Sequence, residues 1–391
     1  MSVKVAIFVP TLSGGGMERA IINIANLLFN NGYDVDLLLA SCKGSLFDEL
    51  DSNINVVCLN QPPYTQPILY DMGICSYKEI MAMLIARIFK ILPKPFKVIN
   101  SIREYISKQR PEIIISTPAT SNLAMVIACS GATSTAKLIL REANTLSVVE
   151  KNKSRFITRL FLKRLDYFYS RAEKIVCVSE GVRKDLVDNY HVSPDNCIVL
   201  YNPVNEELLF KKAACAVVRI NGFAHDLPYY LAMGRLEQQK GFDLLIKAFA
   251  KIHKKVSHNL LILGEGPERA SLEKIIAEHN LKGRVFLPGF ESNPYPYLKN
   301  CDVFVLSSRW EGLANVLREA IAFNKDIVAT DCPSGTREIL SNYPKSIITN
   351  IDYEEIAKSM LKAIDGFSAN EDHANDLEDR NFDYLRFINS L

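Results

Sequence analysis

The sequence reads VAIFV over residues 5–9 and TLSGGG over residues 11–16, and then places Ile21, Ile24 and Leu28 on one helical face. The first run is continuously apolar and rich in β-branched and aromatic residues, which is typical of a strand buried on both faces. The glycines allow a tight turn, and the spacing that follows predicts an amphipathic helix. This unit belongs to parallel sheets covered by helices, so we expect an α/β fold.

The same unit recurs along the chain in two series. We expect strands at residues 5–9, 35–40, 56–59, 113–116, 138–140, 175–179 and 198–201, and then at 230–233, 259–263, 285–287, 303–306 and 327–329. Because a weakly patterned stretch separates the series, we predict two doubly wound, Rossmann-like domains, over residues 1–205 and 206–370. The apolar terminal segment, residues 380–391, either frays or forms a helix that joins the N-terminal domain.

The net charge of the 391-residue chain is small but unevenly distributed. The whole chain carries +2, which gives no indication of a nucleic-acid partner. Residues 1–205 contain 23 basic and 18 acidic side chains, a net charge of +5, and the remainder contains 23 and 26, a net charge of −3. The first half is therefore basic and the second mildly acidic.

The cysteines and the apolar runs exclude several classes of protein. The nine cysteines include no C-x-x-C pair and no dense cluster, so we expect neither a zinc site nor a disulfide scaffold, but a reduced, cytosolic chain. No apolar run reaches the roughly 18 residues of a transmembrane helix, and the N-terminal run lacks a signal-peptide cleavage site.

The strongest candidate site follows the strand expected at residues 303–306 and reads SSRWEGLANVLREA over residues 307–320. Ligands of open α/β folds bind beyond the carboxyl ends of strands, and N–H groups at the start of the next helix attract an anion such as a diphosphate. Glu311 precedes this helix, and Glu319 lies about 12 Å further along its axis. The two carboxylates would accept hydrogen bonds from separate parts of one extended ligand. Alternatively, Glu311 only stabilises the helix N-terminus and Glu319 is a solvated surface residue.

A second candidate site follows the strand expected at residues 230–233 and reads GRLEQQKGFDLL over residues 234–245. Arg235 and Lys240 flank a strand-to-helix turn, where both cations would suit the two phosphates of a nucleotide-sugar and stabilise the charge on a departing diphosphate. The alternative is that these cations pair with Glu237 or Asp243 at the surface.

Two further glycine turns disfavour other nucleotide-binding classes. The LGEGPER stretch, residues 263–269, lacks the third glycine of a dinucleotide fingerprint, and Arg19 stands where that fingerprint has Gly or Ala after the N-terminal glycines. No Walker A loop occurs in the chain. NAD chemistry and P-loop ATPase chemistry are therefore poor interpretations.

Taken together, these segments resemble the retaining nucleotide-sugar glycosyltransferases of the GT-B fold, in particular glycosyltransferase family 4, the group 1 glycosyltransferases. The resemblance covers nearly the whole chain and is most specific in its second half. It rests on GGGMER at residues 14–19, VSEGV at 178–182, YNPV at 201–204, GR at 234–235, KG at 240–241, GEGP at 264–267, PGF at 288–290 and the E-x7-E pair Glu311 and Glu319.

The resemblance implies two Rossmann-like domains that face each other across a cleft, with the donor held by the second and the acceptor by the first. Arg235, Lys240 and Glu311 are implied as catalytic residues: the two cations would hold the diphosphate and Glu311 the hydroxyls of the donor sugar. Glu319 would bind the ribose. Other donor contacts are implied for Gly15, Gly16, Gly234 and Gly264, for the turn from Leu287 to Phe290, which would hold the base, and for the main chain of Gly312, Leu313, Ala314 and Asn315. Such enzymes usually need no metal, and we expect no cofactor.

One departure from the family concerns the acceptor side. Many members carry a His near the end of an N-terminal-domain strand, but this chain has STPATS over residues 116–121, and its first histidine is His191. A front-face transfer, in which the departing phosphate takes the acceptor's proton, does not require that His. Arg141 and Glu142, which follow another expected strand, are the alternative polar lining.

The basic character of the first half is concentrated in two windows, residues 78–110 and 151–174, where Lys and Arg interleave with apolar residues. One interpretation is a pair of ordinary helical segments with solvated basic faces. The other is attachment to an anionic membrane surface, to which each Lys or Arg contributes about 1 kcal/mol. On this second interpretation, we expect a peripheral protein on the inner face of the cytoplasmic membrane.

We therefore predict a retaining, metal-independent glycosyltransferase that moves a hexose or N-acetylhexosamine from a nucleotide-sugar, with UDP favoured, to a glycan acceptor. The acceptor would be a lipid-linked oligosaccharide of polysaccharide or lipopolysaccharide biosynthesis. DCPSGTRE at residues 331–338 resembles a variant of bacterial enzymes in those pathways and weakly supports UDP. The alternatives are a soluble glycosyltransferase with a small acceptor and a non-catalytic sugar-nucleotide or carbohydrate-binding protein.

Overall fold

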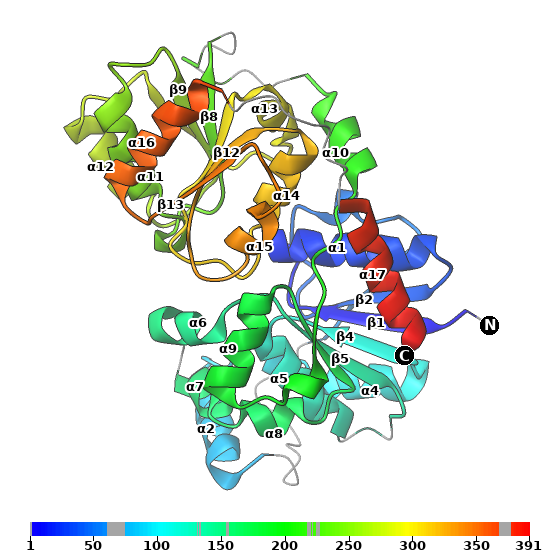
Figure 1. The fold of residues 1–391 in the computed structure, drawn as a ribbon. Coiled ribbons are helices and arrows are strands. Elements are labelled where there is room, and N and C mark those ends of the chain that lie inside the picture. The colour runs from blue at the N-terminus through cyan, green and yellow to red at the C-terminus, as the bar shows by residue number, and fades with distance from the viewer. Residues whose placement is uncertain are drawn as a thin grey trace. The chain divides into compact units, whose positions relative to one another are not determined.

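The computed structural model describes residues 2–391 except 61–74, 131, 133, 154–155, 217–219, 221, 224–226 and 367–376. The chain divides into two compact units (Figure 1): unit 1 comprises residues 1–203 and 379–391, and unit 2 comprises residues 204–378. The acidic stretch that precedes the terminal helix lies largely outside the described residues.

Unit 1 contains a seven-stranded sheet in the order β3-β2-β1-β4-β5-β6-β7, and every neighbouring pair is parallel. The strands are β1 (Lys4–Val9), β2 (Asp34–Leu39), β3 (Asn55–Cys58), β4 (Ile113–Ser116), β5 (Lys137–Glu142), β6 (Lys174–Cys177) and β7 (Cys197–Val199). The helices are α1 (Gly16–Asn30), α2 (Tyr77–Ile88), α3 (Lys94–Lys97), α4 (Ile99–Gln109), α5 (Ala119–Ser130), α6 (Leu146–Lys153), α7 (Phe156–Leu162), α8 (Leu165–Tyr169), α9 (Glu180–Tyr190) and α17 (Leu377–Ser390).

Unit 2 contains a six-stranded parallel sheet in the order β10-β9-β8-β11-β12-β13. Its strands are β8 (Tyr229–Met233), β9 (Asn259–Leu263), β10 (Val285–Gly289), β11 (Val303–Leu306), β12 (Asp326–Thr330) and β13 (Ser346–Thr349). Its helices are α10 (Glu206–Ala213), α11 (Phe242–Ile252), α12 (Arg269–Glu278), α13 (Tyr295–Asn300), α14 (Asn315–Ala322), α15 (Thr336–Leu340) and α16 (Tyr353–Ile364). These two parallel sheets with helices confirm the predicted α/β fold.

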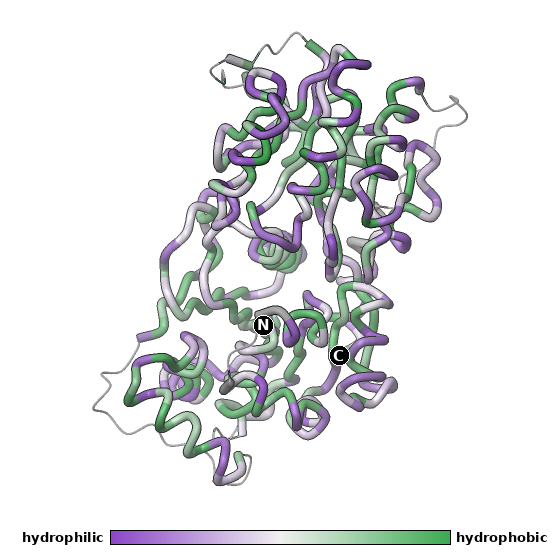
Figure 2. Tube along the Cα trace, turned by 90° about the vertical axis from the view of Figure 1, so that its left-hand side faces the viewer, coloured by the Kyte–Doolittle hydropathy of each residue, from purple (hydrophilic) through white to green (hydrophobic). Residues whose placement is uncertain are grey.

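Each core forms between a sheet and helices that cover it. In unit 1, alternate β1 residues such as Val5 and Ile7 pack with apolar residues of α1 and with Tyr384 and Phe387 of α17. The helix at the end of the chain therefore packs in the core of unit 1. In unit 2, α11, α12 and α16 cover one face of the sheet. Figure 2 shows apolar residues gathered along the central strands.

The expectation that all cysteines are reduced is wrong for one pair, because a disulfide joins Cys42 and Cys58. Strands β2 and β3 are neighbours, with Leu39 opposite Cys58, so the loop after β2 brings Cys42 to the end of β3. The pairing is not evident from the sequence, where the two cysteines lie 16 residues apart. Among the described residues no second disulfide occurs.

Strand β13, at one edge of the unit 2 sheet, was not predicted from the sequence. It pairs only with β12, and three of its four residues are only partly buried. Separately, no helix within the described ranges is long and apolar enough to cross a bilayer.

Candidate active site

The candidate site of unit 2 lies where β8, β11 and β12 end. These strands are neighbours in a parallel sheet, so their carboxyl ends and the turns that follow lie at the same edge. The turn after β8 contains the short 3-10 helix Gln238–Lys240, and the turn after β11 contains Ser308 and Glu311. The topology thus brings together two of the predicted catalytic residues, Lys240 and Glu311.

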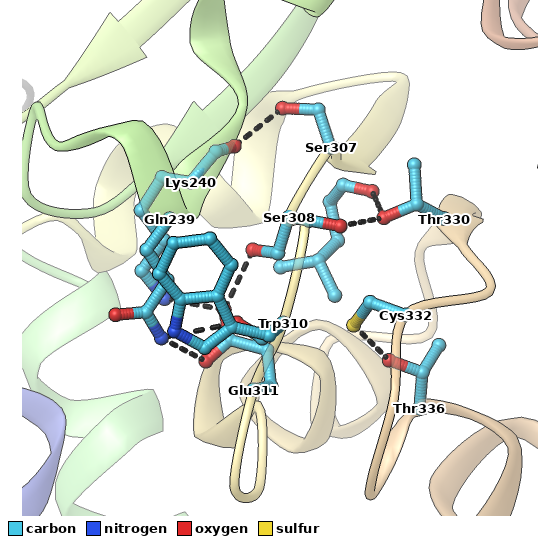
Figure 3. A network of polar contacts seen from close by, with 10 residues as sticks. Gln239, Lys240, Ser307, Ser308, Trp310, Glu311, Thr330, Cys332 and Thr336 are labelled. Carbon is cyan, nitrogen blue, oxygen red and sulfur yellow. Dashed lines mark hydrogen bonds and ion pairs between the residues drawn. The ribbon is translucent and has the colours of Figure 1, made fainter. Parts of the chain in front are cut away.

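Lys240 and Glu311 form an ion pair with 2.6 Å between Nζ and Oε1 (Figure 3). The same carboxylate oxygen accepts a hydrogen bond of 2.6 Å from the Ser308 hydroxyl. Gln239 Nε2 donates to the Trp310 carbonyl at 3.0 Å and lies 3.5 Å from Glu311 Oε2. Glu311 is buried, and these donors hold its carboxylate in one orientation.

Further hydrogen bonds fasten the three turns to one another. The Ser307 hydroxyl donates to the Lys240 carbonyl at 2.8 Å, and the Thr330 hydroxyl, at the end of β12, donates to the Ser308 carbonyl at 2.6 Å. The Arg309 amide donates to the Gln239 carbonyl at 2.7 Å. The sequence analysis did not identify Gln239, Ser308 or Thr330, and the only available signal was the placement of Ser308 three residues before Glu311.

The alternative interpretation of Arg235 and Lys240, that each pairs with an acidic residue at the surface, holds only for Arg235. Asp243 pairs with Arg309 through two contacts of 2.8 and 2.7 Å. Burial would raise the pKa of Asp243, but its hydrogen bond and ion pair with Arg309 lower the pKa overall. Arg235 pairs with Glu237 at 3.3 Å, and its side chain is 76% exposed. Lys240 is therefore built into the site, whereas Arg235 extends into solvent beside it.

Two of the predicted glycines permit close backbone approach. Gly234 has a φ of +154°, and a Cβ there would lie 3.2 Å from the Lys240 side chain. Gly264 has a φ of +151°, and a Cβ there would lie 1.8 Å from the Gly234 carbonyl oxygen. A side chain at Gly264 would therefore push apart the turns after β8 and β9.

The turn predicted to hold the base lies at the end of β10. The Leu287 carbonyl accepts a 3.1 Å hydrogen bond from Arg269, and Arg269 also pairs with Glu265 at 2.7 Å. These contacts tie the turn after β9 to the end of β10. Phe290, the last residue of the predicted base turn, exposes about half of its side chain.

The second carboxylate of the E-x7-E pair lies within α14. Glu319 is buried, and its Oε1 accepts a hydrogen bond of 3.5 Å from the Tyr295 hydroxyl. The helix begins at Asn315, and the residues just before it, Gly312, Leu313 and Ala314, are buried. The Ser334 hydroxyl donates to the Gly312 carbonyl at 3.0 Å, so the loop after β12 supports this segment.

The predicted donor residues of unit 1 lie at the start of α1. Gly15 is the N-cap residue and Gly16 the first helical residue. A Cβ on Gly15 would lie 2.4 Å from the Glu18 carboxylate, so this position has no room for a side chain unless Glu18 moves.

Arg141 and Glu142, the predicted acceptor lining, are fully buried. Arg141 donates to Thr117 Oγ1 at 3.3 Å and to Asn202, and Glu142 accepts from Asn122 at 2.8 Å and from Tyr169. Burial raises the pKa of Glu142 to about 7. Contact with an acceptor requires accessible side chains, and these two instead form a polar network inside unit 1.

Metal-ligating side chains do not gather within the part of the chain that the structure describes: no group of three or more His, Cys, Asp or Glu residues is placed to hold an ion.

Removal of the Lys240 ammonium group should destabilise unit 2, because Glu311 would remain charged in a buried position. We expect Lys240→Met to lower the free energy of unfolding by about 3 kcal/mol, at the lower end of the range of roughly 3–5 kcal/mol for a buried pair that loses one partner, because the Lys240 side chain is partly exposed. Urea unfolding is followed through the fluorescence of Trp310, the single tryptophan of the chain. Because Trp310 lies in unit 2, the signal reports on that unit.

Glu311→Gln should recover most of this loss in the Lys240→Met background, with a coupling energy of about 1–3 kcal/mol in the double-mutant cycle. Lys251→Met is the matched control, since Lys251 and Glu354 form an exposed pair at 3.3 Å. That control should change stability by less than about 0.5 kcal/mol. Additive effects of Lys240→Met and Glu311→Gln would contradict a coupled pair.

Sequence similarity to two described relatives extends over most of the chain. A Campylobacter jejuni protein described as N-acetylgalactosamine-N,N'-diacetylbacillosaminyl-diphospho-undecaprenol 4-alpha-N-acetylgalactosaminyltransferase is 30% identical over 362 residues, which cover 92% of this chain and 90% of the relative. The amylovoran biosynthesis glycosyltransferase AmsD of Erwinia amylovora is 25% identical and covers 87% of this chain, with 84% of its own length matched.

Solved structures agree on the fold. Alr3699/HepE of Anabaena, whose structure contains UDP and glucose, superposes with a TM-score of 0.72 at 18% identity, and the match covers 100% of both chains. Two family models also match in succession: Glycosyltransferase Family 4 over residues 14–208 and Glycosyl transferases group 1 over residues 216–380. This chain therefore belongs to the group 1 glycosyltransferases of family 4 and has their two-domain GT-B fold.

Proposed function

We propose that this glycosyltransferase moves a hexose or N-acetylhexosamine from a UDP-sugar to a lipid-linked glycan, with retention of anomeric configuration and without a metal ion. The observation that carries the proposal is the Lys240–Glu311 pair, which is held at the carboxyl edge of the unit 2 sheet by Ser308 and Gln239. This pair offers a cation for a phosphate and a fixed carboxylate for sugar hydroxyls.

The donor diphosphate would bind to Lys240 and Arg235. Arg235 is exposed and flexible enough to turn from Glu237 to a phosphate, because a surface ion pair is weak. Both cations would stabilise the negative charge that develops on the leaving UDP, which is the role that a metal ion has in other enzymes. This arrangement supports transfer without a metal.

The remaining donor contacts follow from the E-x7-E pair and the base turn. Glu311 would accept hydrogen bonds from the sugar hydroxyls and Glu319 from the ribose. The turn from Leu287 to Phe290, fastened by Arg269, would hold the base. The UDP in the Anabaena structure supports a uridine nucleotide.

Transfer would proceed on one face of the donor sugar. The bond between the anomeric carbon and the diphosphate oxygen breaks, and the acceptor oxygen bonds to the same face of that carbon. The acceptor's proton passes to the departing phosphate, so no protein base is needed. The alpha linkage in the name of the Campylobacter relative agrees with retention from an alpha-linked donor.

The acceptor is proposed from the relatives. The Campylobacter relative acts on a diphospho-undecaprenol saccharide, and AmsD belongs to amylovoran biosynthesis. A lipid-linked acceptor would place this protein at the inner face of the cytoplasmic membrane as a peripheral enzyme.

The reaction is tested with UDP-, GDP- and ADP-sugars and an undecaprenyl-diphosphate-linked saccharide, and nucleotide release and glycan product are both measured. Of the three donor classes, we expect only UDP-sugars to give product. NMR should show an alpha linkage, and EDTA should leave the rate unchanged. Lys240→Ala and Glu319→Ala should lower kcat/KM by about tenfold or more. A beta-linked product, or activity that EDTA abolishes and Mg²⁺ restores, would overturn retention or metal independence respectively. Wild-type rates in both variants would show that the site is misplaced.

Ser308 should act as a positioning residue in this reaction. Its hydroxyl donates to the Glu311 oxygen that also contacts Lys240, so Ser308→Ala would let the carboxylate turn. We expect kcat to fall by about 10- to 100-fold, the equivalent of one hydrogen bond to a charged group. The Kd for UDP should change little, and Ser308→Thr should recover part of the rate.

Ser359→Ala is the matched control for that variant, because Ser359 is also buried in unit 2 but lies in α16. Its kcat should equal that of the wild type. An equal fall in both variants would mean that general destabilisation, and not the orientation of Glu311, explains the Ser308 effect.

A further inference from the structure

Exposed large apolar side chains are concentrated on one short part of unit 1. Of the eleven such side chains among the described residues, seven lie on α2 or on the turn that follows it. Ile88 is 74% exposed and Phe89 is 70% exposed. We call this set the α2 surface: Tyr77, Met81, Leu84, Ile85, Ile88, Phe89 and Ile91.

The α2 surface is not the face with which the helix packs on the protein. Tyr77, Met81, Leu84, Ile85 and Ile88 follow the spacing of one helical stripe. A different stripe, which includes Ile80, Met83 and Ala86, is buried, and α2 contacts α7. The helix therefore packs on the core with one apolar stripe and exposes a second apolar stripe to solvent. An exposed apolar patch of this kind indicates an interaction surface.

Within the described segment from Ser76 to Lys97, the exposed charged side chains are all positive. Lys78, Lys90 and Lys94 are exposed, whereas the one acidic residue of the segment from Ser76 to Lys97 is Glu79. Glu79 is buried, forms a capping box with Ser76, and pairs with Arg164 at 2.9 Å. The segment thus combines apolar side chains with a surrounding positive charge.

The second basic window behaves differently. Phe161, Leu165 and Phe168 are fully buried, and no large apolar side chain described in α7 or α8 is among the exposed ones. The exposed residues described in this window are polar: cations such as Lys163 and Arg171, and also the acidic residues Asp166 and Glu173. Of the two windows predicted to meet a membrane, residues 151–174 contribute charge, and the apolar contact comes from residues 77–91.

We infer that the α2 surface docks on an anionic lipid bilayer, with Ile88 and Phe89 entering the boundary between headgroups and acyl chains. The positive charge favours a bilayer over a second copy of the chain as the partner of this surface. A second copy would bring the lysines of both copies together, whereas anionic headgroups would complement them. This inference rests on the proposed function in one respect: the docking would give the enzyme access to a lipid-linked acceptor.

The test is co-sedimentation of the full chain with vesicles of phosphatidylcholine and phosphatidylglycerol, compared with phosphatidylcholine alone. Wild type should bind the mixed vesicles, and added salt should weaken the binding. The double variant Ile88→Ser/Phe89→Ser should bind about tenfold or more weakly, and Lys78→Gln/Lys94→Gln should lose the preference for phosphatidylglycerol. Leu227→Ser/Ile351→Ser, which removes two exposed apolar side chains from unit 2, should bind like wild type.

Three results would overturn the inference: no binding by wild type, equal binding by Ile88→Ser/Phe89→Ser, or self-association of wild type that this variant abolishes. Circular dichroism of each variant establishes that it is folded. UDP binding, followed through Trp310, needs no vesicles. Vesicle binding without a UDP response would therefore overturn the proposed function and leave the docking surface intact.

Discussion

Every strand of a parallel sheet ends at the same edge, and this constraint is what brings Lys240 to Glu311 across 71 residues of sequence. Strands β8, β11 and β12 are neighbours, so the turns that follow them share hydrogen bonds between side chains and backbone. Gly234 and Gly264 allow the turns after β8 and β9 to approach each other closely. The order of the strands in unit 2 is therefore what forms the Lys240–Glu311 ion pair. We propose that the donor binds at this pair.

Prediction from the sequence was most accurate where burial dictates residue type. Continuous apolar runs such as residues 260–263 coincide with strands because both faces of the sheet are covered. Strand β13 has only two apolar residues, Ile347 and Ile348, and three of its four residues are only partly buried, so we did not predict it. Lys240 and Glu311 could be predicted by their positions after strands, but their contact depends on strand order. Ser308 lies within the candidate stretch 307–320 but was given no role, and Thr330 lies outside every quoted motif; their hydrogen bonds are what identify them.

Segments with similar sequence patterns also differ in whether their side chains are buried or exposed. Arg141 and Glu142 follow an apolar run as a polar ligand site would, yet they lie inside unit 1, where Thr117, Asn122, Asn202 and Tyr169 form hydrogen bonds with them. The two basic windows have the same mixture of cations and apolar residues. Among the residues whose burial the structure describes there, the exposed large apolar side chains lie on α2 and the turn after it. The charge asymmetry of the chain locates a basic half, but the structure decides which part of it presents an apolar surface.

The most direct measurement of the central claim, that the Lys240–Glu311 cluster binds the donor diphosphate, is a UDP titration followed through Trp310 fluorescence. Trp310 precedes Glu311 and is the single tryptophan, so a signal from it reports on this cluster. We expect a saturable change in wild type and a Kd about tenfold or more higher in Lys240→Ala, which corresponds to a loss of roughly 1.4 kcal/mol of binding free energy. No saturable change, or the same Kd in the variant, would contradict it.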